Sequence, residues 1–150
     1  MTISFYRQDG GLQCTASASN VAPRATYVFF PTCGGNNFLG SAVVTANQPL
    51  VGMGSEARSD LRFAMAYSSF QGGTRTAYGP LVFRAYAFGG YTWDSGIAVQ
   101  NLSTSASANI TLTYYNSSGS LAGTQSATLN PRGMQAFFAP VLGLKGSVKI

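Results

Sequence analysis

The sequence contains one pattern twice, once near each end of the chain. Four blocks match in the same order: residues 2–6 with 111–115, Pro23-Arg24 with Pro131-Arg132, Phe29-Phe30 with Phe137-Phe138, and Gly40-Ser41 with Gly146-Ser147. The offset between equivalent positions falls from 109 to 106 residues, which a few loop insertions in the first copy explain. Because the matches are collinear, a duplicated structural unit explains them better than chance does.

Each copy has the pattern of a β-meander. Ile3 and Phe5 alternate with polar or aromatic neighbours, and the Asp9-Gly10 turn supplies the positive φ of a tight hairpin. Further strands are expected at 12–21 and 26–30. The second copy repeats the plan, and its strands are expected at 110–115, 121–129 and 134–138.

The middle of the chain also favours strands. They are expected at 40–46, 50–53, 63–67, 81–86 and 93–102, with a solvated connection at 55–60. No segment has a sustained helical period, so the chain is expected to be all-β. The Gly72-Gly73 loop within 68–77 is the best boundary, which divides the chain into domains 1–75 and 76–150.

Charge is sparse, since only 9% of the residues are charged, whereas about 25% is usual. The net charge is +5, but the arginines are scattered singly, which disfavours nucleic-acid binding. No apolar run is long enough to span a membrane as a helix. Because Met1 begins almost inside a strand, we expect that a secreted protein with this sequence would be a mature or excised portion.

The residues that catalysis needs are scarce. The absence of histidine excludes Ser-His and Cys-His nucleophiles, and the four acidic residues form no obvious pair. Two cysteines without histidine are too few ligands for a metal site. We therefore expect no enzyme activity, no metal and no cofactor.

Cys14 and Cys33 flank Pro23 at nine and ten residues, so a hairpin centred there would bring them nearly opposite each other. A disulfide would contribute about 3 kcal/mol and would indicate an oxidising, extracellular compartment. The alternative is two small buried thiols.

Four aromatic residues surround a glycine turn and could stack on sugar rings: Tyr86, Phe88, Tyr91 and Trp93. The alternative is that Phe83 and Trp93 are core residues of facing strands, because a buried tryptophan is common in β-sandwiches. Three sequons mark possible glycosylation at Asn101, Asn109 and Asn116.

The segments 40–51, 80–83 and 93–103 resemble tandem repeats of bacterial surface and secreted proteins. The resemblance implies immunoglobulin-like, antiparallel β-sandwich units and no catalytic residue. It also implies that the first unit lacks its opening strands and the second its closing strands.

An incomplete sandwich leaves strand edges and apolar faces in water. The two units could pack into one body, an edge could be completed by a strand from another subunit, or the chain could be a window on a longer repeat protein. The function classes are thus a structural subunit of an extracellular filament, pilus-like fibre or surface layer, built as a head-to-tail homopolymer, or an adhesive module that binds polysaccharide.

Overall fold

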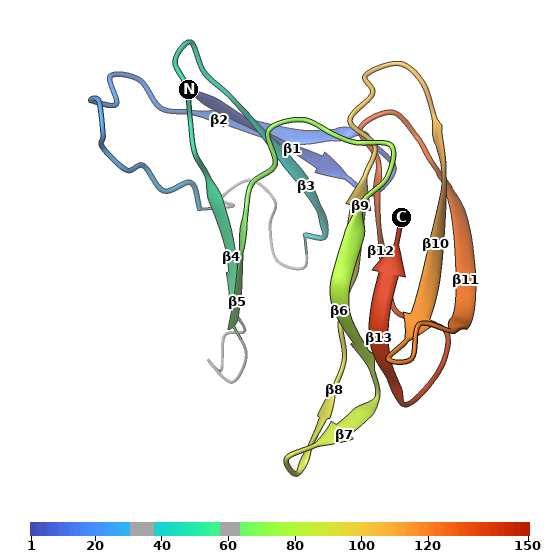
Figure 1. The fold of residues 1–150 in the computed structure, drawn as a ribbon. Helices are drawn as coiled ribbons and strands as arrows, with labels where there is room; N and C mark the ends of the chain where they lie inside the picture. Colours follow the sequence, from blue (N-terminus) through green and yellow to red (C-terminus); the bar gives the residue numbers. More distant parts are fainter. Residues whose placement is uncertain (31–37, 58–63) are drawn as a thin grey trace.

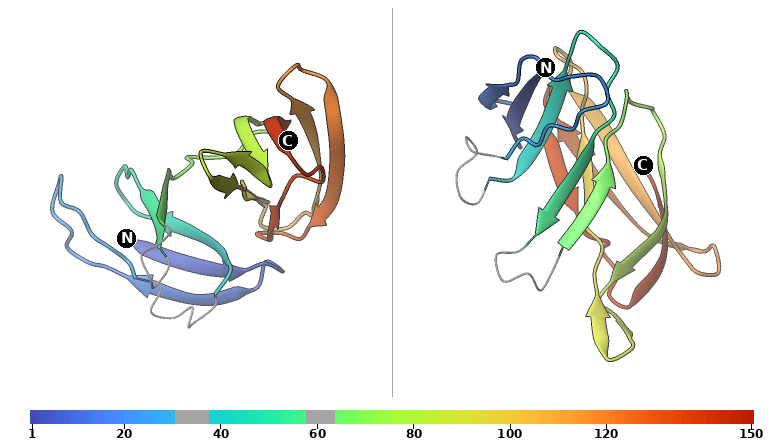
Figure 2. Two further views of the ribbon diagram at one scale, coloured as in Figure 1. Left: turned by 90° about the horizontal axis from the view of Figure 1, so that it is seen from below. Right: turned by 90° about the vertical axis from the view of Figure 1, so that its left-hand side faces the viewer.

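The protein is all-β, as the sequence predicts. The computed structural model describes residues 1–30, 38–57 and 64–150 (Figure 1), and these contain thirteen strands. No helix in these ranges is long and apolar enough to cross a membrane. We refer to residues 1–68 as the N-terminal unit and to residues 77–150 as the C-terminal unit. They lie side by side and are joined by a segment without strands (Figure 2).

The N-terminal unit is built on one small sheet. Its central strand, β1 (Thr2–Arg7), pairs antiparallel with β2 (Leu12–Ser17) on one side and β3 (Gly40–Thr45) on the other. A separate hairpin consists of β4 (Met53–Ala57) and β5 (Ala64–Ser68). The side chains of Ile3 and Phe5 are buried, as their alternation predicts.

The C-terminal unit is a two-layer sandwich. One layer has the order β11-β10-β13-β6 and consists of β6 (Tyr78–Arg84), β10 (Ala108–Asn116), β11 (Leu121–Leu129) and β13 (Leu144–Lys149). The other layer pairs β9 (Ile97–Gln100) with β12 (Met134–Phe137). A third pair, β7 (Tyr86–Phe88) and β8 (Tyr91–Trp93), extends from the lower end of the sandwich (Figure 1).

The main core fills the space between the two layers of the C-terminal unit. Its centre is Leu112 and Tyr114 of β10 and Val148 of β13, whose side chains are fully buried. Phe137 of β12 and the half-buried Ile97 of β9 close it from the other layer. Alternating apolar positions on β10 therefore face the core, as expected for a strand covered on one side.

The two copies of the sequence pattern have the same local structure. In each hairpin the register shifts by one residue at equivalent positions, between Phe5 and Tyr6 in β1 and between Tyr114 and Tyr115 in β10. The Gly40-Ser41 start of β3 pairs with Tyr6 and Arg7 as Gly146-Ser147 of β13 pairs with Tyr115 and Asn116. The duplication predicted from the sequence is thus a structural one.

The copies differ after their second strand. In the C-terminal unit, residues 134–137 form β12 because β9 pairs with them. The equivalent residues 26–29 were expected to form a strand, but no strand is assigned to residues 25–30. A strand needs a hydrogen-bonded neighbour, and among the described residues none plays the part of β9 for this segment.

Several predicted boundaries were wrong. The strand expected at 12–21 ends at Ser17, and the one expected at 50–53 lies mostly further on, at Met53–Ala57, where a solvated connection was predicted. The expected strands 81–86 and 93–102 are each broken, at Ala85 and at residues 94–96. Ala85 has a φ of 46°, which no continuous strand accommodates.

Candidate functional site

The four aromatic residues singled out from the sequence come together on one face of the β7–β8 hairpin. Tyr86 lies opposite Trp93, and Phe88 lies opposite Tyr91. Directly opposed residues of an antiparallel pair share a face, and residues two apart on a strand do so as well. All four side chains therefore lie on the same face.

This face is largely open to solvent. The exposed fractions are 68% for Phe88, 73% for Tyr91 and 47% for Trp93. The alternative interpretation, with Phe83 and Trp93 in the core between facing strands, does not describe the structure: Phe83 is half-buried and stacks on Tyr86, with ring centroids 5.5 Å apart. The Trp93 indole N–H donates to the Phe88 carbonyl at 3.1 Å, which holds the ring over the hairpin.

The hairpin has a defined turn and a charged base. Gly89 and Gly90 have φ values of 63° and 79°, which the two-residue turn between Phe88 and Tyr91 requires. At the base, the Arg84 guanidinium donates to the Asp94 carboxylate at 2.7 Å, and the Ala85 amide donates to the same oxygen at 2.9 Å. These two bonds lower the pKa of Asp94, the Arg84 bond contributing most.

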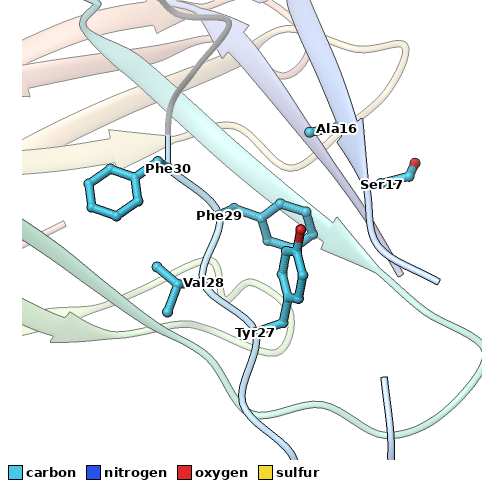
Figure 3. A pocket seen from close by; sticks show the side chains of 6 residues that line it. All are labelled: Ala16, Ser17, Tyr27, Val28, Phe29 and Phe30. Carbon is cyan, nitrogen blue, oxygen red and sulfur yellow. The ribbon is translucent and has the colours of Figure 1, made fainter. Parts of the chain in front are cut away.

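A second exposed apolar surface lies on the N-terminal unit. Residues 27–30 run beside the end of β2 and line a hollow of about 220 Å³ together with Ala16 and Ser17 (Figure 3). Phe29 and Tyr27 point to the strand side of the segment in this view, and their rings are 4.9 Å apart. Val28 and Phe30 project the other way and are 68% and 75% exposed.

The two units meet at two turns. The tip of the β1–β2 hairpin touches the turn that joins β11 to β12 (Figure 1). The Met134 amide donates to the Gln8 carbonyl at 3.1 Å, and the Asn130 side-chain amide donates to the Asp9 carbonyl at 3.3 Å. A side chain at Gly10 would overlap the Pro131 carbonyl oxygen, so the approach depends on glycine.

One side-chain pair links the units beside these turns. The Arg132 guanidinium donates to the Tyr6 hydroxyl at 2.7 Å, and its central carbon lies 4.9 Å from the centre of the Tyr6 ring. The contact thus combines a charge-assisted hydrogen bond with a cation–π interaction.

The three sequon asparagines have different surroundings. Asn101 is buried, and its amide nitrogen donates to the carbonyls of Ala106, Leu129 and Asn130, so the folded chain does not present it to solvent. Asn109 and Asn116 are exposed. Asn109 accepts a hydrogen bond from Thr128, and the Asn116 side-chain oxygen accepts bonds from Ser118 and Ser120 in the β10–β11 turn.

Cys14 lies on β2, and Cys33 lies outside the described residues, so the Cys14–Cys33 disulfide stays a prediction. In the described ranges no three side chains of His, Cys, Asp or Glu gather in a way that could hold a metal ion.

Two contacts were missed from the sequence. The Arg84–Asp94 pair could have been found from the charge opposition across a short hairpin. The Tyr6–Arg132 pair joins residues far apart in the chain. Its one trace in the sequence is that both copies of the repeated pattern carry a tyrosine at the position of Tyr6 and an arginine at the position of Arg132.

Comparisons with family models, curated proteins and solved structures gave no match to this chain.

Proposed function

We propose that the chain is a non-catalytic structural subunit of an extracellular filament, pilus-like fibre or surface layer. Copies of the chain assemble head to tail, and an extended strand of one copy completes the N-terminal unit of another. The observation that carries this proposal is the segment 25–30, which occupies the place of β12 in the duplicated pattern but has no strand paired with it among the described residues.

The C-terminal unit indicates what kind of strand fits there. β9 pairs with β12 so that Ile97 lies opposite Phe137 and Gln100 lies opposite Met134. In the N-terminal unit the equivalent positions are Phe29 and Thr26. A strand with the sequence pattern of β9 would thus hydrogen-bond to the backbone of 26–29 and place an apolar side chain next to Phe29.

Covering this surface is favourable because it is strongly apolar. Val28 and Phe30 are mostly exposed, and Tyr27 is half-exposed. Full burial of one such side chain contributes about 1.5 to 3 kcal/mol. Exposed backbone edges drive association between chains unless charged side chains protect them. In the segment 22–30 the only charged residue is Arg24.

Assembly is tested by measuring size against concentration. We expect sedimentation velocity to show species that grow from micromolar concentrations upward, and negative-stain electron microscopy to show fibres or sheets. A monodisperse monomer at all concentrations, without fibres, would contradict the proposal.

A strand peptide tests the mode of assembly. The peptide of residues 95–102, which contains β9, should occupy the 25–30 segment and shorten the filaments. The same peptide with Val99→Pro lacks a ladder N–H and is the matched control. If both peptides leave filament length unchanged, strand exchange at this segment is wrong.

A second function is favoured by the β7–β8 face. Three exposed aromatic rings and Tyr86 on one side of the hairpin form a platform of the kind that stacks on sugar rings, which would make the chain a carbohydrate-binding or adhesive module. This use is compatible with a filament subunit, because the hairpin lies away from the 25–30 segment (Figure 1).

Substitution of the exposed rings tests this second function. Tyr91→Ala and Trp93→Ala should reduce retention on polysaccharide columns at least tenfold while the thermal unfolding midpoint changes little, because neither ring is in the core. Leu142→Ala, which removes an exposed apolar side chain elsewhere, is the control. Unchanged retention, or equal loss in the control, would exclude the platform.

A further inference from the structure

The contact between the two units has two halves, and each half occurs twice in the chain. One half is the β1–β2 turn with Tyr6. Its equivalent is the β10–β11 turn with Tyr115, and the two turns share their backbone hydrogen bonds: Gly10 to Arg7 at 2.9 Å, and Gly119 to Asn116 at 3.0 Å. The glycines have φ values of 89° and 82°.

The other half is the turn that carries Arg132. Its equivalent carries Arg24. Both turns are closed by the same backbone bond, Gly133 to Asn130 at 2.9 Å and Ala25 to Ala22 at 3.1 Å. Arg132 and Arg24 have φ values of 61° and 64°, a left-handed conformation that arginine rarely adopts.

Only one of the two possible pairings is made within the chain. Tyr6 binds Arg132, whereas Tyr115 and Arg24 form no side-chain hydrogen bond, ion pair or ring contact with any residue that the structure describes. Arg24 is exposed and Tyr115 is half-buried. The β10–β11 turn lies at the lower right of Figure 1 and the segment 20–30 at the upper left, so the two leftover halves face different directions.

We propose that these leftover halves bind each other between molecules: the β10–β11 turn and Tyr115 of one copy dock on the Arg24 turn of a second copy. This inference rests on the proposed function, that copies of the chain join, and names the surface by which they do so. The contact uses different surfaces on the two partners, so it is head to tail and extends into a filament when its rotation does not close.

The equivalent contacts can be assigned residue by residue. Tyr115 receives the Arg24 guanidinium as Tyr6 receives that of Arg132. The Thr26 amide, equivalent to that of Met134, donates to the Ser117 carbonyl, equivalent to that of Gln8. Gly119 has open space around its Cβ position, where Gly10 is covered by Pro131, as expected for a docking turn that is empty in the single chain.

Two positions differ between the halves. Ala22 stands in place of Asn130, so the hydrogen bond to the Asp9 carbonyl has no counterpart. Ala25 stands in place of Gly133, where an added Cβ would lie 3.1 Å from the Gln8 carbonyl oxygen. The contact between molecules is therefore slightly wider than the one within the chain, and the Tyr115–Arg24 pair contributes a larger share of it.

Two complementary variants test the contact. Arg24→Glu removes the cation from one half, and Tyr115→Ala removes the ring from the other; neither side chain belongs to the core. Each variant alone should assemble at a concentration at least tenfold higher than the unsubstituted chain does. An equal mixture should form a dimer that does not grow, because the intact Tyr115 of the first variant meets the intact Arg24 of the second.

The controls match the substitutions in chemistry. Arg75→Glu makes the same charge change at another exposed arginine, and Tyr78→Ala removes another exposed tyrosine. Both should assemble like the unsubstituted chain, and circular dichroism should show all four variants folded. Light scattering coupled to size exclusion reports the masses.

The outcomes separate this inference from the proposed function. If the unsubstituted chain forms fibres and the two variants do so at the same concentration, or if their mixture stays monomeric, the turn contact is wrong while assembly stands. If the unsubstituted chain never assembles, the proposed function is wrong and this contact falls with it.

Discussion

At the scale of single residues, Tyr114 combines full burial with a polar group. Its side chain lies in the centre of the C-terminal core, and its hydroxyl donates to the Gln125 side-chain oxygen at 2.8 Å. Burial raises the pKa of this hydroxyl above its usual value of 10.0, because the charged phenolate is poorly solvated there.

This shift predicts a loss of stability in alkali. The pKa of Tyr114 is higher in the folded chain than in the unfolded chain. The stability that this residue contributes is therefore fully present below about pH 10 and is lost as the pH rises through the folded pKa. Tyr114→Phe should reduce the free energy of unfolding by about 1 kcal/mol at pH 7 and weaken the decline above pH 10. Urea titrations followed by circular dichroism between pH 7 and 11 measure both effects. An equally steep alkaline decline in the variant would assign it to other tyrosines.

The sequence shows some residue-level features and hides others. The pairing of Pro23-Arg24 with Pro131-Arg132 was visible as a repeated dipeptide. The left-handed conformation of both arginines was not, because propensity assigns that region to glycine and asparagine. The buried amide of Asn101 was hidden for a similar reason: a sequon looks the same whether its asparagine is a modification site or a structural bridge.

At the scale of strands, equivalent positions in the two units experience different surroundings. Leu112 of β10 and Ile3 of β1 are equivalent, and both point to the inner face of their sheets. Leu112 is enclosed by a second layer that contains β9 and β12. Ile3 is 8% exposed and is not a member of the core cluster that surrounds Leu112.

We expect the two positions to differ in their response to truncation. Leu112→Ala should cost about 4 to 5 kcal/mol, since it leaves a cavity in a closed core, whereas Ile3→Ala should cost about 2 kcal/mol, at the low end of the range for such truncations. Chemical denaturation of both variants measures this difference. A cost for Ile3→Ala as large as that for Leu112→Ala would indicate that another layer already covers the N-terminal sheet.

Strand existence was more predictable than strand continuity. Alternation located β1 and β10, because each has one buried face. It could not locate the breaks at Ala85 and at residues 94–96, where the chain leaves the sandwich to form the β7–β8 hairpin. Those breaks depend on the Asp94 carboxylate accepting bonds from Arg84 and Ala85, a local arrangement without periodicity.

At the scale of the whole molecule, the sequence predicts two related units but not how they meet. Tyr6 belongs to the first copy and Arg132 to the second, so the structure of a single copy does not predict that they meet. The sequence also did not predict that the aromatic face of the β7–β8 hairpin is open to solvent, because the sequence pattern was consistent with either an exposed or a buried Trp93.

The contact between the units should be measurable as a coupling energy. In a double-mutant cycle of Tyr6→Ala and Arg132→Ala, we expect the two side chains to be coupled by about 1 to 2 kcal/mol. The cycle of Tyr6→Ala with Lys145→Ala, whose ammonium faces Tyr86 instead, should show none. Additive effects in the first cycle would mean that the pair contributes nothing to joining the units.

The position of the terminal strands within their sheets has a mechanical consequence. β1 lies between β2 and β3, and β13 lies between β10 and β6, so neither strand nearest an end of the sequence is at an edge. A pull along either strand must slide it past two neighbours and break two rows of backbone hydrogen bonds together, whereas an edge strand is held by only one such row. Tension applied through the ends of this sequence is therefore resisted at the strongest part of each sheet.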